Sequence, residues 1–415
     1  MEVKLSKFYI LLLLVFSWMP RLNIISETDF SYFLLLPCFY FFLSIFKNGF
    51  VLRFKDFKWI VFFLLIVTLS SLINAVNFKT MILNIRWLLM PLFFYFFLLN
   101  SKLKLNEIKK IIKFIYIIAI LHIPIAFFKF YVLEWDGEWP LGLIGYSYST
   151  LFVLIFLSGV LSHYLTFRKL KYLILVLGVL IIAFSSGKRA LVLLMPLTIL
   201  FYFLISGYFK SKFFRSVLII TILVPSILVI LIKINPTLNK ERKVWGSFDV
   251  NYALNYIQEY TSKNRLGEDY RLANRSTTTF YILNYLFENP KNFVFGLGGD
   301  KFSKTEMKKD KSSKEVNVIE YGINGFGWLS FQFGFIAAFM WFMFFLKFYR
   351  NGKNLYERSN DIFWRTYGLT IMGSSIALSI VQFSYAPDFK NPVFISAVYL
   401  FLFPAKILNA RYYEK

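Results

Sequence analysis

Long apolar runs follow one another along this chain, and a single long polar stretch interrupts them. The polar stretch extends from about 235 to 323 and carries charges of both signs. A helix needs roughly 20 apolar residues to cross a bilayer, with about 17 to 25 tolerated. Of the 415 residues, 58% are hydrophobic, a fraction too high for an ordinary soluble domain. The sequence therefore predicts a membrane protein with one large excursion into water.

The same length rule predicts an all-α fold, a polytopic bundle of about twelve membrane-spanning helices. Residues 1–234 would hold the first nine spans, residues 235–323 the large loop, and residues 324–415 the last three spans. The expected spans cover approximately residues 8–20, 30–46, 59–76, 81–99, 111–131, 145–167, 172–184, 190–209, 216–234, 325–348, 364–385 and 393–408.

Positive charge is distributed unequally between the two sets of short loops. The net charge of +24 is spread over these loops and not gathered in one domain, which argues against a nucleic-acid partner. One set carries roughly twenty lysines and arginines and the other about five, a bias that marks the richer side as cytoplasmic. Both termini are then cytoplasmic, and the large loop faces the periplasm or the cell exterior. Because no ATP is available there, chemistry on that side needs a substrate that is already activated.

The large loop itself has helical signals. Residues 252–260 and 277–287 place aromatic and aliphatic side chains at helical spacing. Asn289-Pro290 is expected to end the second of these helices. The glycines at 296, 298 and 299 either make the backbone flexible or let it approach another segment closely.

Several cations are expected on the outer side, where positive charge is otherwise scarce. Arg86 lies inside the fourth span, and Lys188 and Arg189 lie in a tight polar turn, Ser-Ser-Gly-Lys-Arg, between two spans. Such a turn can direct cations and backbone N–H groups toward an anion. The plainer alternatives are an Arg86 side chain that reaches the interface and a basic pair that contacts lipid headgroups.

Two further arginines, Arg271 and Arg275, stand four residues apart in the loop and would share one face of a helix. Guanidinium groups match phosphate oxygens bidentately, whereas lysine offers a point charge. One of them, together with Arg86 and Arg189, could clamp a pyrophosphate at the outer membrane surface. The alternative is a pair of solvated arginines on a helix surface.

Glu320, just before the tenth span, is the candidate general base, since a carboxylate near the membrane can have a raised pKa. The alternative is an ordinary solvated loop carboxylate. The chain has only two histidines, both in or beside apolar segments, so no zinc site is expected in the loop. No other metal and no cofactor are expected either.

Three stretches make the chain resemble the bacterial O-antigen polymerase and O-antigen ligase superfamily. The first is the turn at 185–190, Ser-Ser-Gly-Lys-Arg-Ala, similar to a Ser-x-x-Arg turn ahead of a span. The second is Arg275 followed by an aromatic-rich helix, Pro290 and the Gly-Leu-Gly at 296–298. The third is the segment 323–329, Ile-Asn-Gly-Phe-Gly-Trp-Leu, similar to the His-Asn segment that opens the span after the loop in ligases. The resemblance covers roughly residues 172–348.

The third stretch departs from the ligase pattern because Ile323 stands where ligases carry the histidine that is their presumed base. Isoleucine cannot accept a proton, which favours a polymerase. The resemblance then implies transfer of a growing glycan from undecaprenyl pyrophosphate to a lipid-linked repeat unit at the inner membrane. The resemblance and the charge pattern together assign catalysis to Arg189, Arg275 and a base such as Glu320, and substrate contacts to Arg86, Arg271, Lys188 and Asn324. Undecaprenyl-pyrophosphate-linked glycans, membrane lipids, a chain-length regulator and a flippase are the implied partners.

Three other functions fit parts of the sequence. An O-antigen ligase would transfer the same chain to lipid A core. A metal-dependent glycosyltransferase would use Glu27 and Asp29 as its metal pair. A lipid-linked oligosaccharide flippase would also have about twelve spans, but it has no evident use for an outer loop of this length.

Overall fold

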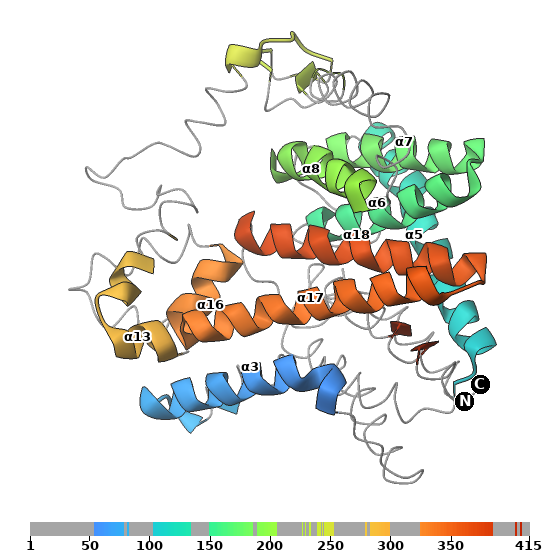
Figure 1. Cartoon of the computed structure of the whole chain (residues 1–415). Helices are drawn as coiled ribbons and strands as arrows, with labels where there is room; N and C mark the ends of the chain where they lie inside the picture. The colour runs from blue at the N-terminus through green and yellow to red at the C-terminus, as the bar shows by residue number, and fades with distance from the viewer. Residues whose placement is uncertain are drawn as a thin grey trace.

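The computed structural model describes residues 54–78, 81–82, 103–133, 149–185, 189–205, 283–298 and 324–384, with short pieces between 226 and 279 and between 403 and 408. These residues form helices and no strand (Figure 1), which confirms the all-α prediction for this part of the chain. The helices are α3 (Phe54–Ile73), α5 (Leu105–Tyr131), α6 (Ser149–Phe167), α7 (Leu170–Ser185), α8 (Arg189–Ile205), α13 (Pro290–Phe295), α16 (Gly325–Phe333), α17 (Phe335–Arg358) and α18 (Ile362–Ser384).

Two of these helices contain stretches long and apolar enough to cross a bilayer, Leu105–Lys129 in α5 and Thr150–Phe167 in α6. Shorter apolar stretches occur in α3, α7 and α8. The spans expected at 8–20, 30–46, 81–99, 216–234 and 393–408 lie wholly or largely outside the described residues. The total of about twelve therefore stays a prediction.

The long helices pack side by side in the order shown in Figure 1, where α17 lies between α3 and α18, and α6 packs on the other side of α18. The α17–α18 contact is close because two glycines face each other across it. A Cβ atom on Gly368 would lie 2.7 Å from the carbonyl oxygen of Gly352, too close for any side chain. Small residues at such crossings let helix backbones approach, which is how apolar helices gain packing contacts in a membrane.

The tenth expected span, residues 325–348, is not one continuous helix, so that prediction was wrong in its detail. The helix α16 ends at Phe333, and α17 begins at Phe335. Gly334 between them has φ of 90°, a left-handed conformation that only glycine adopts without strain. A Cβ atom there would also lie 2.0 Å from the carbonyl oxygen of Val294. The glycine thus ends one helix and makes room for a neighbouring segment, and hydropathy alone does not register either effect.

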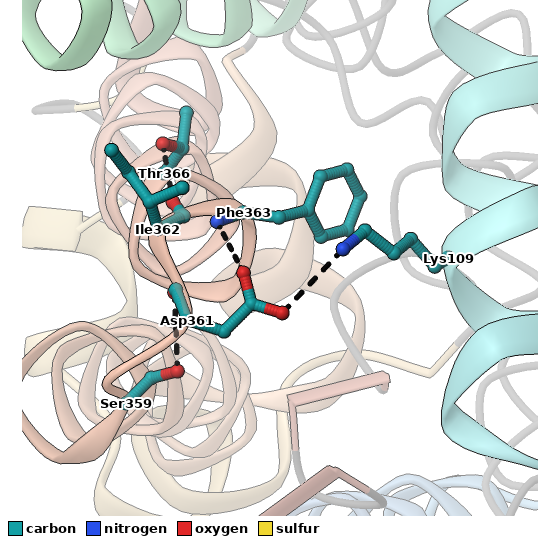
Figure 2. A network of polar contacts seen from close by, with 6 residues as sticks. All are labelled: Lys109, Ser359, Asp361, Ile362, Phe363 and Thr366. Atoms are coloured by element: carbon teal, nitrogen blue, oxygen red, sulfur yellow. Dashed lines mark hydrogen bonds and ion pairs between the residues drawn. The ribbon is translucent and has the colours of Figure 1, made fainter.

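One end of the bundle is rich in positive charge and is here called the basic end. The start of α5 meets the turn from α17 into α18 there (Figure 2). The turn from α6 into α7 lies on the same side, because the His163 ring near the end of α6 contacts the rings of Tyr116 in α5 and Tyr172 in α7. There Lys109 Nζ lies 3.5 Å from Asp361 Oδ2 and 4.7 Å from the centre of the Phe363 ring. Asp361 also accepts a hydrogen bond of 2.8 Å from the backbone N–H of Phe363, so one carboxylate starts α18 and joins it to α5. Exposed cations at this end include Lys110, Lys113, Arg168, Lys169, Lys171, Lys353, Arg358 and Arg365.

Candidate functional site

Residues 283–298 of the large loop dock at the end of the bundle opposite the basic end. A helical segment finishes at Phe287, and α13 then begins at Pro290, which occupies the first helical position. Asn289 caps α13, because its Oδ1 accepts a hydrogen bond of 3.0 Å from the N–H of Lys291. This confirms that Asn289-Pro290 ends the second loop helix, and it adds that the same pair starts another.

The Gly-Leu-Gly segment that follows α13 binds to the backbone of α16. The N–H of Leu297 donates to the carbonyl of Phe331 at 2.8 Å, and the N–H of Gly298 donates to the carbonyl of Gln332 at 2.9 Å. A Cβ atom on Gly296 would lie 2.5 Å from the carbonyl carbon of Gln332. The glycines were expected either to make the backbone flexible or to let it approach another segment closely. For Gly296 and Gly298 the structure confirms the close approach.

The end of α3 completes this contact from the other side. Ser70 Oγ donates to the carbonyl oxygens of Phe295 and Gln332, the latter at 3.2 Å. Asn74 Nδ2 donates to the carbonyl of Gly296 at 3.2 Å, and a Cβ atom on Gly298 would lie 2.9 Å from the Asn74 Cβ. Three segments far apart in sequence thus meet at backbone distance. We call this contact of residues 70–76, 294–298 and 330–334 the junction.

Ser70 and Asn74 were missing from the residues singled out in the sequence. Their signal is modest: two polar side chains, one helical turn apart, near the end of an otherwise apolar run. Such a pattern is common in apolar helices. Only the structure shows that these two side chains bind carbonyl groups of distant segments.

Asn324, expected to contact substrate, is buried at the start of α16. Its Oδ1 accepts a hydrogen bond of 2.8 Å from the N–H of Gly327, so the side chain caps this helix. The cap fixes where α16 begins, and α16 in turn supplies the carbonyls that bind the Gly-Leu-Gly segment. Asn324 therefore helps to place the junction.

Buried polar groups without a hydrogen-bond partner lie in the helices around the junction. Among the described residues, they include Ser330 Oγ and Gln332 Oε1 on α16 and Gln382 Oε1 near the end of α18, which packs against α16. An unsatisfied buried polar group costs free energy, and native proteins keep few of them without a reason. These three groups are uncharged, and hydroxyl or amide groups of a ligand would match them chemically.

A second polar cluster lies nearer the basic end and is here called the helix seam. Tyr116 OH lies 3.1 Å from Thr370 Oγ1, Thr370 Oγ1 donates to Ser162 Oγ at 2.9 Å, and Ser162 pairs with Tyr202 OH. These hydroxyls join α5, α18, α6 and α8. Because they bind one another, they have little capacity left for a ligand, and the seam is best explained as a fastening between helices.

Most residues of the predicted pyrophosphate clamp lie outside the part of the chain that the structure describes. Arg189 is the first residue of α8, and its backbone lies toward the end opposite the basic end, since Tyr202 near the other end of α8 meets the seam. Its side chain, like the whole of Arg86, Lys188, Arg271, Arg275 and Glu320, lies outside the described residues. The clamp therefore stays a prediction.

A short piece at the start of the large loop is held by an ion pair. Lys240 Nζ lies 2.5 Å from Asp249 Oδ2, and Asp249 Oδ1 accepts a hydrogen bond from the N–H of Tyr252. The hydrogen bond from Lys240, with that backbone N–H, holds the pKa of Asp249 below its ordinary value of 3.8. In the part of the chain that the structure describes, no group of three or more histidine, cysteine or acidic side chains could hold a metal ion.

No protein-family model matches the chain, and no curated protein matches its sequence.

Proposed function

We propose that this protein is an inner-membrane O-antigen polymerase. It would transfer a growing glycan from undecaprenyl pyrophosphate to the non-reducing sugar of a lipid-linked repeat unit on the periplasmic face. The bond between the anomeric carbon and the pyrophosphate oxygen breaks, a new bond forms to the acceptor hydroxyl, and undecaprenyl pyrophosphate leaves. The acceptor's proton passes to a base, for which Glu320 is the candidate.

The observation that carries the proposal is the junction. One of the stretches on which the family resemblance depends, the Gly-Leu-Gly at 296–298, is hydrogen-bonded there to the end of α16, the helix that another of these stretches opens. A loop fixed to a rigid bundle in this way is a usual place for binding and chemistry. The junction also lies opposite the basic end, on the side where the charge bias predicts the periplasm.

Arginines would supply most of the catalysis. Negative charge develops on the leaving pyrophosphate, and guanidinium groups held nearby stabilise that charge more in the transition state than in the ground state. Arg189, at the start of α8, and Arg275, in the loop, are the proposed catalytic pair, with Arg86, Arg271 and Lys188 as further contacts. No metal ion is required in such a scheme.

Substitution of Arg189 and Arg275, singly, to Ala and to Lys tests this assignment. We expect each Ala variant to leave one repeat unit on lipid A core, with no ladder of longer glycans on a gel. The Lys variants should be nearly as damaging, because a point charge loses the bidentate contact. A normal ladder from either Ala variant would remove that arginine from the mechanism. A purified assay that offers lipid A core as the alternative acceptor separates the polymerase from a ligase.

A further inference from the structure

Four phenylalanine rings form a continuous column beside the junction. The rings of Phe287 and Phe293 stack with centroids 4.8 Å apart, and those of Phe293 and Phe335 stack at 5.1 Å. Phe326 contacts Phe335 edge to face at 5.7 Å. The column thus connects the loop, through α13, to the first residue of α17.

The column continues along one face of α17. Phe339, one turn after Phe335, is 46% exposed, and Phe342 and Leu346 follow on the same face with partial exposure. The opposite face of α17 is buried against its neighbours, as Trp341 and Phe345 show. At the other end of the column Phe287 is 62% exposed although it lies in the loop. We call this surface, from Phe287 to Leu346, the aromatic strip.

A lipid-facing helix surface alone does not explain the strip. Such a surface should stop where the expected span begins, at residue 325, whereas the strip extends onto Phe287 and Phe293 of the large loop. An interfacial anchor is the other ordinary explanation, but anchors are typically Trp and Tyr, which have a polar tip for the headgroup layer. All four rings of the column are phenylalanine, with no polar tip.

We propose that the aromatic strip binds the isoprenoid chain of the polyprenyl pyrophosphate carrier. The identity of the carrier depends on the proposed function, while the location of its chain is a separate claim. The strip begins beside the junction, so a chain lying on it would bring its pyrophosphate to the loop that holds the candidate arginines. Branched isoprene units present methyl groups and double bonds that pack well against ring faces.

Photolabelling of the full chain in lipid nanodiscs tests the strip. The probe is a polyprenyl pyrophosphate that carries a diazirine in its isoprenoid chain. We expect peptides of α13 and α17 to be labelled, and undecaprenyl phosphate, but not phosphatidylglycerol, to compete. Phe287→Ala and Phe339→Ala should each lower the labelling roughly five-fold, because each removes exposed apolar contact area. Phe339 is exposed, so the melting temperature of its variant should not change, whereas Phe287→Ala also removes the stack on Phe293 and is compared at equal folded fraction.

The matched control is Phe128→Ala, since Phe128 is 52% exposed near the end of α5, outside the strip. It should label like the wild type. Unchanged labelling in both strip variants, or equal competition by phosphatidylglycerol, would overturn the proposal. If the strip is labelled as expected but the purified protein makes no polymer, the carrier site stands and the polymerase assignment fails. If polymer forms while the label maps elsewhere, the strip fails and the polymerase assignment stands.

Discussion

The helix seam and the junction are both buried and both polar, yet they are built from different parts of the chain. In the seam, hydroxyl groups on four helices bind one another. At the junction, Ser70, Asn74 and backbone N–H groups bind carbonyls of a loop and of an interrupted helix, with glycines where the segments touch. The seam holds helix to helix, whereas the junction holds a loop to the bundle. Damage to the seam should therefore reduce stability, and damage to the junction should reduce activity.

The strongest disruption of the junction is expected from Gly334→Ala. The new Cβ would lie 2.0 Å from the Val294 carbonyl oxygen at a residue with φ of 90°. Backbone strain together with overpacking should cost about 3 kcal/mol or more. We expect no glycan ladder and faster proteolysis of the loop. Gly178→Ala is the control, since its Cβ would meet only the Ile123 side chain at 3.1 Å; equal damage from both variants would contradict a special role for the junction.

Thr370→Val removes the central hydroxyl of the seam without changing side-chain shape. Tyr116 and Ser162 each lose a partner, which should lower the unfolding free energy by roughly 1 to 2 kcal/mol. Thermal unfolding in detergent measures the loss. The folded fraction of the variant should still make glycans of normal length. If the variant is fully folded and yet gives no ladder, the seam has a direct part in the reaction.

Ser70→Ala is the corresponding change at the junction. The stability loss should be about 1 kcal/mol, because the Gln332 carbonyl keeps its hydrogen bond from Gly298. The glycan ladder should nevertheless become shorter and fainter than in Thr370→Val, since the Phe295 carbonyl of the loop loses its hydrogen bond from α3 and only Asn74 still holds the loop there. If the two variants lose activity only in proportion to their stability, the contrast between the two regions disappears.

The ion pair between Lys240 and Asp249 lies outside both regions, and a change of pH should break it without touching either of them. Because the pKa of Asp249 is lowered in the fold, its contribution is present above pH 3.8 and is lost as the pH falls through the folded-state pKa. Limited proteolysis should show this piece opening as the pH falls below 3.8. Asp249→Asn should make the cleavage rate independent of pH in that range, and a wild-type rate that does not change would contradict the ion pair.

Gln332→Leu should have the smallest effect on stability. The amide oxygen has no hydrogen-bond partner, so an apolar side chain of similar size leaves no group stranded and should hold or slightly raise the melting temperature. A fall of several degrees would mean that the amide does have a partner in the folded protein.

Sequence patterns predicted the helices well and the junction poorly, for a physical reason. Apolar runs placed α5, α6 and α18 within six residues of their observed bounds, because burial of a whole helix depends on many side chains at once. The break at Gly334 depends on one residue and on the Val294 carbonyl beside it. The helix boundary at Asn289-Pro290 could be predicted because a cap depends on neighbouring residues alone. Ser70 could not, because its hydrogen-bond partners lie more than two hundred positions away in the sequence. The arginines, chosen from spacing and resemblance, lie mostly outside the described residues and stay predictions.

Polymerisation by the purified protein in proteoliposomes tests the proposed reaction most directly. The reaction would contain only the lipid-linked repeat unit and a chelator of divalent cations. A metal-independent polymerase should give a ladder of glycans on the lipid carrier and release undecaprenyl pyrophosphate, and Gly334→Ala should lose both. A protein that is folded and intact but yields no ladder, or yields one only when a divalent cation is restored, would contradict the proposed reaction.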